Sequence, residues 1–283
     1  MSIGVAIITC NRPDFFVQCY ESIPAYVDKI VIVNDGKPFT HEIKKSKRQD
    51  LLGLTQVIEN YPNNHQVGQC KNQAMQALLD AGCDYIFTME DDIKIKDPQV
   101  FWNYIRASCS TGIQHMNFGF SQRENLDRDL KPAIKKEIEY PDGTTICLTP
   151  NILGAFTFYT RKALQTIGLH HYKFNKGHGD HPELTYRAYK HGFTTPFWWF
   201  ADIYGSWNMI ENLSNMGSDS LVRNQEKFMQ NFQEACSTFE MLHGVNMLKV
   251  PDIGEAAVVQ CLKTINENNH CREPIYRRFD SRD

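Results

Sequence analysis

The sequence predicts an α/β protein with a mostly parallel central sheet flanked by helices. Short, continuous apolar runs of strand length alternate with stretches of helical periodicity through the first half of the chain. Strands that are apolar on both faces are typical of parallel sheets covered by helices on each side. Acidic residues also follow two of these runs, at the strand ends where open α/β sheets bind their ligands.

The first half of the chain contains four predicted strands and two predicted helices. Apolar runs of strand length lie at residues 3–9, 29–33, 54–58 and 84–89. Helical spacing of apolar residues predicts one helix over 15–23 and an amphipathic helix over 68–81. Strands separated by helices in this way predict parallel pairing.

The second half is less regular. Residues 123–141 are polar and interrupted, and a turn at residues 141–143 predicts a hairpin. A strand is predicted over 153–159, and helices over 161–167 and 182–191, the latter with Pro182 in its favoured first turn. An aromatic run at 197–200 follows, and residues 221–243 form a predicted surface helix before a polar tail.

Composition argues against several classes of protein. A net charge of −3 gives no sign of extended, non-specific nucleic-acid binding, although basic clusters occur at 44–48, 131–136 and 277–282. The nine cysteines stand singly, which indicates a reducing compartment and a cytoplasmic location. The N-terminus has no basic leader, and no run of about 18 apolar residues is present to span a membrane.

Three adjacent carboxylates end the fourth predicted strand. Glu90, Asp91 and Asp92 directly follow an apolar run, and like charges this close raise one another's pKa unless a cation intervenes. Mg²⁺ and Mn²⁺ bind carboxylate oxygens together with substrate phosphates. The pattern therefore favours a metal site that holds a nucleoside diphosphate. The alternative is an acidic capping turn before Asp97.

Two further segments fit a nucleotide site. Asp35 and Gly36 follow the second predicted strand, where a carboxylate can accept hydrogen bonds from a base or ribose, although Asp-Gly turns are common. Lys71 lies near the start of a predicted helix, where a cation and the helix N-terminus can help to place phosphates. No Gly-x-Gly-x-x-Gly or Walker sequence occurs, which argues against a dinucleotide enzyme or a P-loop protein.

A loop with two glycines, at residues 177–180, leads into the helix predicted to begin at Pro182. Asp180 and His181 stand just before this helix, where a carboxylate or an imidazole can take a proton from an acceptor hydroxyl. The alternative is that Asp180 caps the helix and His181 faces solvent. Taken alone, this segment leaves both interpretations open.

The segments, taken in order, resemble the inverting family 2 glycosyltransferases of the GT-A fold. Thr9-Cys10-Asn11-Arg12 is similar to the Thr-Tyr-Asn-Arg that usually ends the family's first strand, and Asn34-Asp35-Gly36 to the Asp-Asp-Gly that ends its second. Lys71-Asn72 stands at the family's Arg-Asn, and Glu90-Asp91-Asp92 at its Asp-x-Asp metal motif. Residues 154–169 look like its acceptor-side strand and helix, and 179–187 like its Gly-Glu-Asp-x-Glu-Leu-x-x-Arg segment.

The resemblance implies a GT-A domain over residues 1–220, with a nucleotide-sugar-binding half (1–110) and an acceptor-side half (111–220). Residues 221–283 are then a C-terminal helical extension. It implies metal-dependent, inverting transfer of a hexose or pentose from a nucleotide-sugar donor, with a UDP-sugar favoured, Mn²⁺ or Mg²⁺ as cofactor and Asp92 as metal ligand. The residues expected to bind the donor are Thr9, Asn11, Arg12, Asp35, Gly36, Lys71, Glu90 and Asp91.

One departure from the family concerns the catalytic base. His181 stands where the family has the Asp of Glu-Asp, and Asp180 stands where it has the Glu. Asp180 is favoured as the base, while His181 is an alternative base or a group that orients the acceptor or approaches the metal. Gly154, Trp199 and Trp207 are expected to contact the acceptor, with aromatic core packing as the alternative for the tryptophans.

The acceptor stays open at the level of the sequence. It is a saccharide, a protein or a modified DNA base, since some phage enzymes that resemble this class glycosylate hydroxymethylated cytosine. DNA would require a basic groove and base flipping. A module that binds nucleotide sugars or glycans without turnover is the alternative of another class. A nucleotidyltransferase is a weaker option because no glycine-rich loop follows the first strand.

Overall fold

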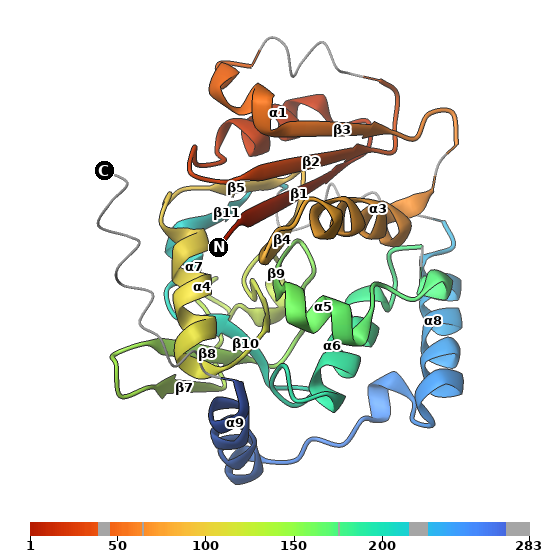
Figure 1. Cartoon of the computed structure of the whole chain (residues 1–283). Helices are drawn as coiled ribbons and strands as arrows, with labels where there is room; N and C mark the ends of the chain where they lie inside the picture. Colours follow the sequence, from red (N-terminus) through yellow and green to blue (C-terminus); the bar gives the residue numbers. More distant parts are fainter. Residues whose placement is uncertain (39–45, 64, 175, 215–225, 270–283) are drawn as a thin grey trace.

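The computed structural model describes residues 1–38, 46–63, 65–174, 176–214 and 226–269. Its centre is a six-stranded sheet in the order β3-β2-β1-β4-β9-β6 (Figure 1). The parallel strands are β1 (Ile3–Thr9), β2 (Lys29–Asn34), β3 (Thr55–Glu59) and β4 (Tyr85–Glu90). Strand β9 (Phe156–Thr160) runs antiparallel to β4 and to β6 (His115–Asn117). The predicted α/β class with a mostly parallel sheet is confirmed.

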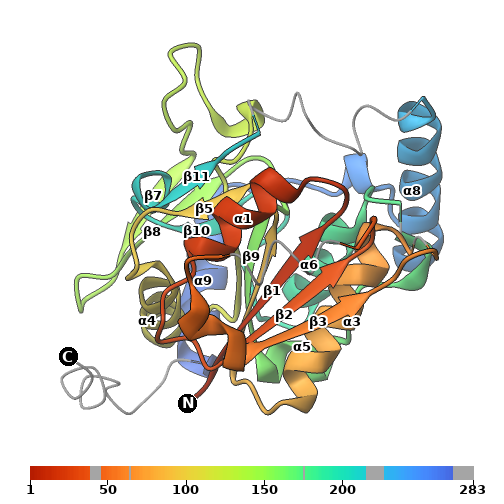
Figure 2. The same ribbon diagram turned by 90° about the horizontal axis from the view of Figure 1, so that it is seen from above.

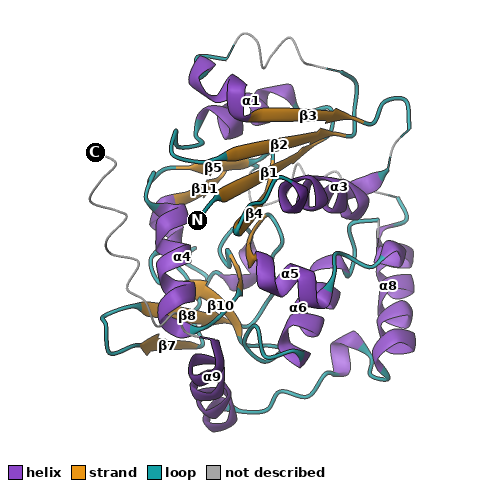
Figure 3. Cartoon of the chain, in the orientation of Figure 1, coloured by secondary structure: helices purple, strands orange, loops and turns teal. Residues whose placement is uncertain are grey.

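Helices cover the two faces of this sheet (Figure 3), and the two faces belong to separate hydrophobic cores. Along β1, Ile3, Val5 and Ile7 pack into one core, and Ala6 and Ile8 pack into the other. Alternate residues of a strand face opposite sides, so a strand covered on both sides must be apolar throughout. The covering helices are α1 (Pro13–Glu21) and α4 (Val100–Thr111) on the first face, and α3 (Gln66–Asp80), α5 (Arg161–Ile167) and α6 (Asp180–Lys190) on the second.

Two small antiparallel sheets pack beside the central sheet. One has the order β10-β8-β7, formed by β7 (Lys136–Glu139), β8 (Thr145–Thr149) and β10 (Phe200–Ile203). The turn predicted near residues 141–143 does connect β7 to β8 as a hairpin. The other sheet pairs β5 (Ile93–Ile95) with β11 (Ile210–Asn212), and Leu213 N donates to Asp92 O at 2.7 Å. This pairing fixes the backbone directly after the acidic strand end.

The two C-terminal helices lie well apart in both views (Figure 1 and Figure 2), one at the right edge and the other at the bottom of Figure 1. Helix α8 (Phe228–His243) packs Phe239 into a third core with Tyr186 and Phe197. Helix α9 (Glu255–Asn269) buries Val258, Leu262 and Ile265 in the same core as β1, so this part of the polar tail is packed and not merely appended. The short helices are α7 (Ser206–Met209) and the 3-10 turns Gln49–Leu54, Arg123–Asn125, Tyr172–Phe174 and Met247–Lys249.

Helix starts differ from the predicted ones in a way that matters for the site. Helix α6 begins at Asp180, two residues before the predicted start, because Gly179 adopts a left-handed φ of 75° and its carbonyl accepts from Glu183 N at 2.9 Å. Asp180 and His181 therefore belong to the first helical turn. Part of the predicted 221–243 helix, residues 221–225, lies outside the described residues. In the described part of the chain, no helix has the length and apolar character needed to cross a membrane.

Candidate active site

A pocket of about 890 Å³ opens at the carboxyl ends of the parallel strands. Strand β1 lies between β2 and β4, so the chain changes direction across the sheet at β1. Ligands of open α/β sheets bind at such a switch point. The pocket is lined by the ends of β1 and β4 on one side and by the start of α6 and residues of α8 on the other.

Most of the predicted site residues line this pocket. They are Thr9, Arg12, Asp35, Lys71, Glu90, Asp91, Asp92, Gly154, Asp180 and His181. Asn11, Gly36, Trp199 and Trp207 do not line it. Their roles in donor or acceptor binding stay predictions.

Asn11 and Gly36 join the loops that follow β1 and β2. Asn11 adopts a left-handed φ of 55°, and its side-chain oxygen accepts from Lys37 N at 2.9 Å. A Cβ on Gly36 would lie 2.5 Å from that same oxygen. Position 36 therefore needs glycine, because the loop after β2 approaches Asn11 of the loop after β1 closely.

Asp35 anchors the start of α3. Its Oδ1 accepts from Asn60 Nδ2 at 3.1 Å and from His65 N at 2.9 Å, and its Oδ2 accepts from Gln66 N at 2.9 Å. The first N–H groups of a helix have no partner within the helix, so this carboxylate satisfies them and opposes the positive helix end. Asp35 thereby fixes the helix that carries Lys71.

Arg12 binds the acids at the end of β4, and we call Thr9, Arg12, Asp91 and Asp92 the Arg12 cluster. The guanidinium donates to both oxygens of Asp91, and to Asp92 Oδ2 at 3.2 Å. Thr9 Oγ1 donates to Asp91 Oδ2 at 2.8 Å. Asp92 Oδ1 is buried and accepts no hydrogen bond from any described residue.

The acids of the Arg12 cluster are harder to ionise than ordinary carboxyls. Burial raises the pKa of Asp91 to about 7, although Arg12 opposes the shift. Burial, and then the charge of Glu90, raises the pKa of Asp92. The single guanidinium of Arg12 thus does not compensate the negative charges of Asp91 and Asp92. A further cation beside Asp92 would stabilise its ionised form.

Lys71 organises the other side of the pocket, and we call Lys71, Glu90, Gly154, Asp180 and His181 the Lys71 cluster. Lys71 is fully buried, and its Nζ lies 2.9 Å from Glu90 Oε1 and 2.8 Å from His181 Nε2. It also lies 3.4 Å from Gly154 O and 3.8 Å from Asp180 Oδ2. An ammonium group can only donate, so Nε2 of His181 accepts, and the proton of the neutral imidazole is on Nδ1.

Gly154 makes room for His181. A Cβ on residue 154 would fall inside the imidazole ring of His181. The ring therefore lies against bare backbone, within reach of Lys71. The structure gives Gly154 this positioning role, and its predicted contact with the acceptor stays a prediction.

Asp180 stays ionised although it is buried. Burial alone would raise its pKa, but His181, Lys71 and His170 outweigh burial and lower the pKa to about 2. Burial lowers the pKa of His181 to about 4, although Asp180 opposes this shift. At neutral pH the pair therefore consists of a carboxylate and a neutral imidazole. Asp180 Oδ2 accepts no hydrogen bond within the described part of the chain.

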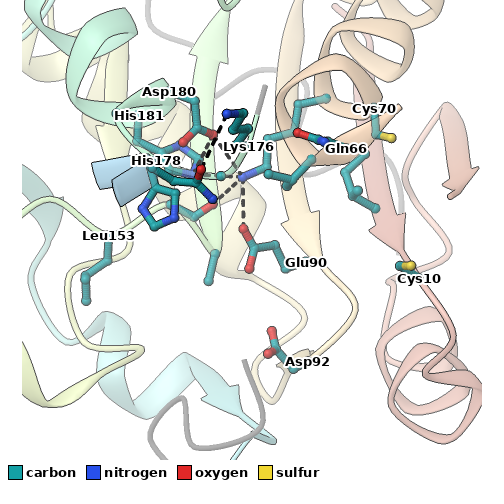
Figure 4. Close-up of a pocket in the computed structure, with 18 of the residues that line it drawn as sticks. Cys10, Gln66, Cys70, Glu90, Asp92, Leu153, Lys176, His178, Asp180 and His181 are labelled. Atoms are coloured by element: carbon teal, nitrogen blue, oxygen red, sulfur yellow. Dashed lines mark hydrogen bonds and ion pairs between the residues drawn. The ribbon is translucent and has the colours of Figure 1, made fainter. Parts of the chain in front are cut away.

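Glu90 stands between the two clusters. Figure 4 shows it below the wall formed by Asp180 and His181, with Asp92 on its far side. Burial opposes ionisation of Glu90, but its contact with Lys71 lowers its pKa below the usual value. The two clusters thus meet at one carboxylate.

The two tryptophans predicted to contact the acceptor are packed elsewhere. Trp199 Nε1 donates to Asp252 Oδ1 at 2.6 Å, and Lys135 Nζ lies 3.7 Å from the centre of its ring. Trp207 packs edge-to-face against Phe120 and Tyr204, with ring centres 5.1 Å apart in each pair. These contacts match the alternative of aromatic packing that the sequence left open.

Three described residues of the basic clusters pair with acids. Arg48 Nη2 lies 2.7 Å from Asp50 Oδ2, Lys135 Nζ lies 3.0 Å from Asp252 Oδ2 and Lys136 Nζ lies 2.7 Å from Glu255 Oε1. Lys44, Lys45 and residues 277–282 lie outside the described residues.

Sequence reasoning missed several residues of the pocket wall. They include Gln66, Lys176, His178, Asn231, Phe232 and Met247. The last three come from α8 and the turn after it, a segment with no motif and no apolar strand pattern. Only the tertiary packing of α8 against α6, which includes His243 Nε2 at 3.2 Å from Glu183 Oε1, brings them to the pocket.

The residues at the pocket fit a divalent metal. Asp92 Oδ1 is a buried carboxylate oxygen without a protein partner among the described residues, and it belongs to a side chain that lines the pocket. Hard cations such as Mg²⁺ and Mn²⁺ take such oxygens as ligands. Asp92 is therefore the residue that would hold the ion.

Comparison with known proteins identifies the fold. No protein family matches the chain, and no curated protein matches its sequence. The chain is similar to the crystal structure of S. aureus TarS, with a TM-score of 0.57 and 14% identity over 100% of this chain and 46% of that one. It is also similar to GalNAc-T7 with UDP, GalNAc and Mn²⁺, with a TM-score of 0.54 and 11% identity over 96% of this chain and 55% of that one.

These likenesses show that the chain has the GT-A fold of glycosyltransferases, as the resemblance implied. The chain spans about half the length of the two solved structures. At these identities the likeness defines the architecture, while donor, acceptor and mechanism must be argued from the site itself.

Proposed function

We propose that this chain is a metal-dependent, inverting glycosyltransferase that moves a sugar from a nucleoside diphosphate to an acceptor hydroxyl. One observation carries the proposal. Asp92 Oδ1 and Asp180 Oδ2 are buried carboxylate oxygens without hydrogen-bond partners among the described residues. Their side chains line the same pocket, Asp92 from the end of β4 and Asp180 from the start of α6. The first suits a metal and the second suits a base.

On the donor side, Asp92 would hold Mn²⁺ or Mg²⁺, and a metal bound there neutralises the diphosphate that leaves. Arg12 orients Asp92 through its second oxygen. Thr9, Asp35, Glu90 and Asp91 shape the wall against which the nucleotide lies. We favour a UDP-sugar with Mn²⁺ because the similar GalNAc-T7 structure contains UDP and Mn²⁺.

On the acceptor side, Asp180 Oδ2 takes the proton of the attacking hydroxyl. His181 is less suited to this step, because its Nε2 already accepts from Lys71 and its Nδ1 carries the proton of the neutral ring. Attack from the face opposite the departing diphosphate inverts the anomeric carbon. General-base catalysis of this kind contributes about 10²- to 10⁴-fold in rate.

The setting that we propose is the cytoplasm. The eight cysteines that the structure describes are all free thiols, in keeping with a reducing compartment. We propose residues 1–220 as the GT-A domain and 221–283 as its extension, with a saccharide as the acceptor.

The test is a panel of nucleotide sugars, first in a thermal-shift assay with and without Mn²⁺ and then in an assay for diphosphate release. We expect one donor to raise the melting temperature only with Mn²⁺ and to release nucleoside diphosphate. A protein that is stabilised but never releases diphosphate is the binding module that the sequence left open. Glycan arrays and duplex DNA with hydroxymethylated cytosine, supplied as alternative acceptors, identify the acceptor class, and NMR of the product shows whether the anomeric configuration is inverted.

A further inference from the structure

Three ligand-type atoms gather around Asp180. His170, Asp180 and His181 each offer one such atom, and these atoms lie within 4.8 Å of one another. The residues His170 and Asp180 are only 4% and 2% exposed. His170 Nε2, Asp180 Oδ2 and His181 Nδ1 all lack hydrogen-bond partners among the described residues. Two of these atoms, His170 Nε2 and Asp180 Oδ2, are acceptors, and leaving two buried acceptors without partners in one place is unfavourable unless a cation binds there.

His170 is held as a metal ligand would be. Its Nδ1 lies 3.1 Å from Asp180 O, and a carbonyl oxygen can only accept, so the ring proton is on Nδ1 and Nε2 carries a lone pair. Histidines that bind metals almost always donate their other ring N–H to a carbonyl or carboxylate, which fixes the ring. Asn72 also holds the backbone of His170, through His170 N to Oδ1 at 2.9 Å and Nδ2 to His170 O at 2.8 Å.

The local charge favours a cation, with one competitor. Glu90 and Asp180 carry two negative charges and Lys71 carries one positive charge, so this group has a net charge of −1. The competitor is Lys71, whose Nζ donates a hydrogen bond to the lone pair of His181 Nε2 at 2.8 Å. An ion bound to His181 must displace this one bond, and Lys71 keeps its contacts with Glu90 and Gly154.

We propose that His170, Asp180 and His181 form a second cation site, separate from Asp92, that takes zinc or a similar borderline-soft divalent ion. Two imidazoles and one carboxylate are a donor set that zinc accepts, whereas magnesium and calcium prefer oxygen ligands throughout. An ion there occupies Asp180 Oδ2. Where Asp180 is the base, as in the proposed function on which this consequence rests, zinc inhibits transfer.

The direct test is zinc binding by the full chain without nucleotide, measured by competition with a coloured chelator. Wild type is expected to bind one zinc ion that His170→Gln binds at least about tenfold more weakly, while His171→Gln, a change of the neighbouring histidine outside the site, leaves the affinity unchanged. Equal affinity in wild type and His170→Gln, or no binding by wild type, overturns the proposal. Cobalt spectra of the wild-type protein need no variant: visible bands of a four-coordinate ion with nitrogen ligands support the site, and a spectrum of six-coordinate cobalt alone contradicts it.

A second arm separates this inference from the proposed function. Zinc is added to the transfer reaction supported by Mn²⁺, and the inhibition constant is compared between wild type and His170→Gln. An increase of at least about tenfold in the variant supports the site, and an unchanged inhibition constant contradicts it. If no donor is ever consumed, the proposed transferase fails, while the binding titration still decides whether the zinc site exists.

Discussion

Two cations, the partly exposed Arg12 and the fully buried Lys71, organise the two ends of the pocket, and their surroundings differ. Arg12 binds Asp91 and Asp92, which are neighbours in the sequence. Lys71 binds Glu90 and His181, which come from distant segments. In each cluster one carboxylate keeps an oxygen without a described partner, but the pKa of Asp92 is raised whereas that of Asp180 is lowered to about 2.

The difference follows from what lies around each carboxylate. Asp92 has Glu90 as a repelling neighbour and shares Arg12 with Asp91. Asp180 has Lys71 and two imidazoles beside it, and it lies in the first turn of α6, where the helix dipole favours negative charge. The Arg12 cluster therefore gains from an added cation, while the Lys71 cluster already holds a carboxylate that is ionised at neutral pH.

The largest expected effect comes from removing the carboxylate of the Lys71 cluster. Asp180→Asn should lower the rate of sugar transfer by about 10³-fold, because the general base is lost. Stabilisation by donor and Mn²⁺ should persist, since Asp92 is untouched. Initial rates and thermal shifts measured side by side test this, with Asp129→Asn as an exposed control. Transfer within tenfold of wild type would remove Asp180 from the base role.

Removing the carboxylate of the Arg12 cluster is expected to affect donor binding, which Asp180→Asn leaves intact. Asp92→Ala should abolish the Mn²⁺-dependent part of donor binding and lower both donor hydrolysis and transfer by at least about 10²-fold, because the diphosphate loses its electrostatic stabilisation. Titration of Mn²⁺ against the thermal shift, with and without chelator, measures this loss. Full activity of the variant in the presence of chelator would contradict a metal at Asp92.

A smaller effect is expected from the contact that holds His181 in the Lys71 cluster. Gly154→Ala places a methyl group inside the imidazole ring, so His181 must leave Lys71. Crowding of this kind costs about 1–3 kcal/mol of stability, and we expect transfer to fall as well. Gly53→Ala is the matched control, because nothing lies within 4 Å of the added Cβ. Equal rates and melting temperatures for the two variants would refute the positioning role of Gly154.

The two clusters also differ in how far the sequence predicts them. Thr9 and Glu90 end neighbouring parallel strands, so the apolar runs already place Arg12 and the acids together. In the Lys71 cluster, Gly154 and His181 are separated from Lys71 by 83 and 110 positions in the sequence. The local sequence pattern does not predict contacts between residues so far apart. For the same reason α4 and α9 were not predicted, since their packing against each other, with Asn266 Nδ2 2.5 Å from Ser110 O, is tertiary.

The smallest expected effect concerns Asp202, a buried carboxylate that accepts hydrogen bonds but pairs with no cationic side chain among the described residues. Asp202 accepts from Gly119 N at 2.9 Å and from Ser206 Oγ at 2.7 Å, and also from Tyr104, yet burial raises its pKa to about 6. Because the folded value lies above the unfolded one, the stability that Asp202 contributes is present below the unfolded pKa and is lost as pH rises through about 6.

The stability of wild type relative to Asp202→Asn should therefore fall by about 1 kcal/mol per pH unit between about pH 4 and 6. Relative to Asp180→Asn, the stability of wild type should not fall over the same range: it should rise slightly near pH 4, where an unfolded aspartate is still partly protonated, and then stay constant, because Lys71 and the imidazoles keep folded Asp180 ionised throughout. Denaturant unfolding at several pH values, with chelator present, measures both slopes. Equal slopes would mean that hydrogen bonds alone stabilise a buried carboxylate here as well as Lys71 does, and the contrast between cation-paired and cation-free acids would not hold.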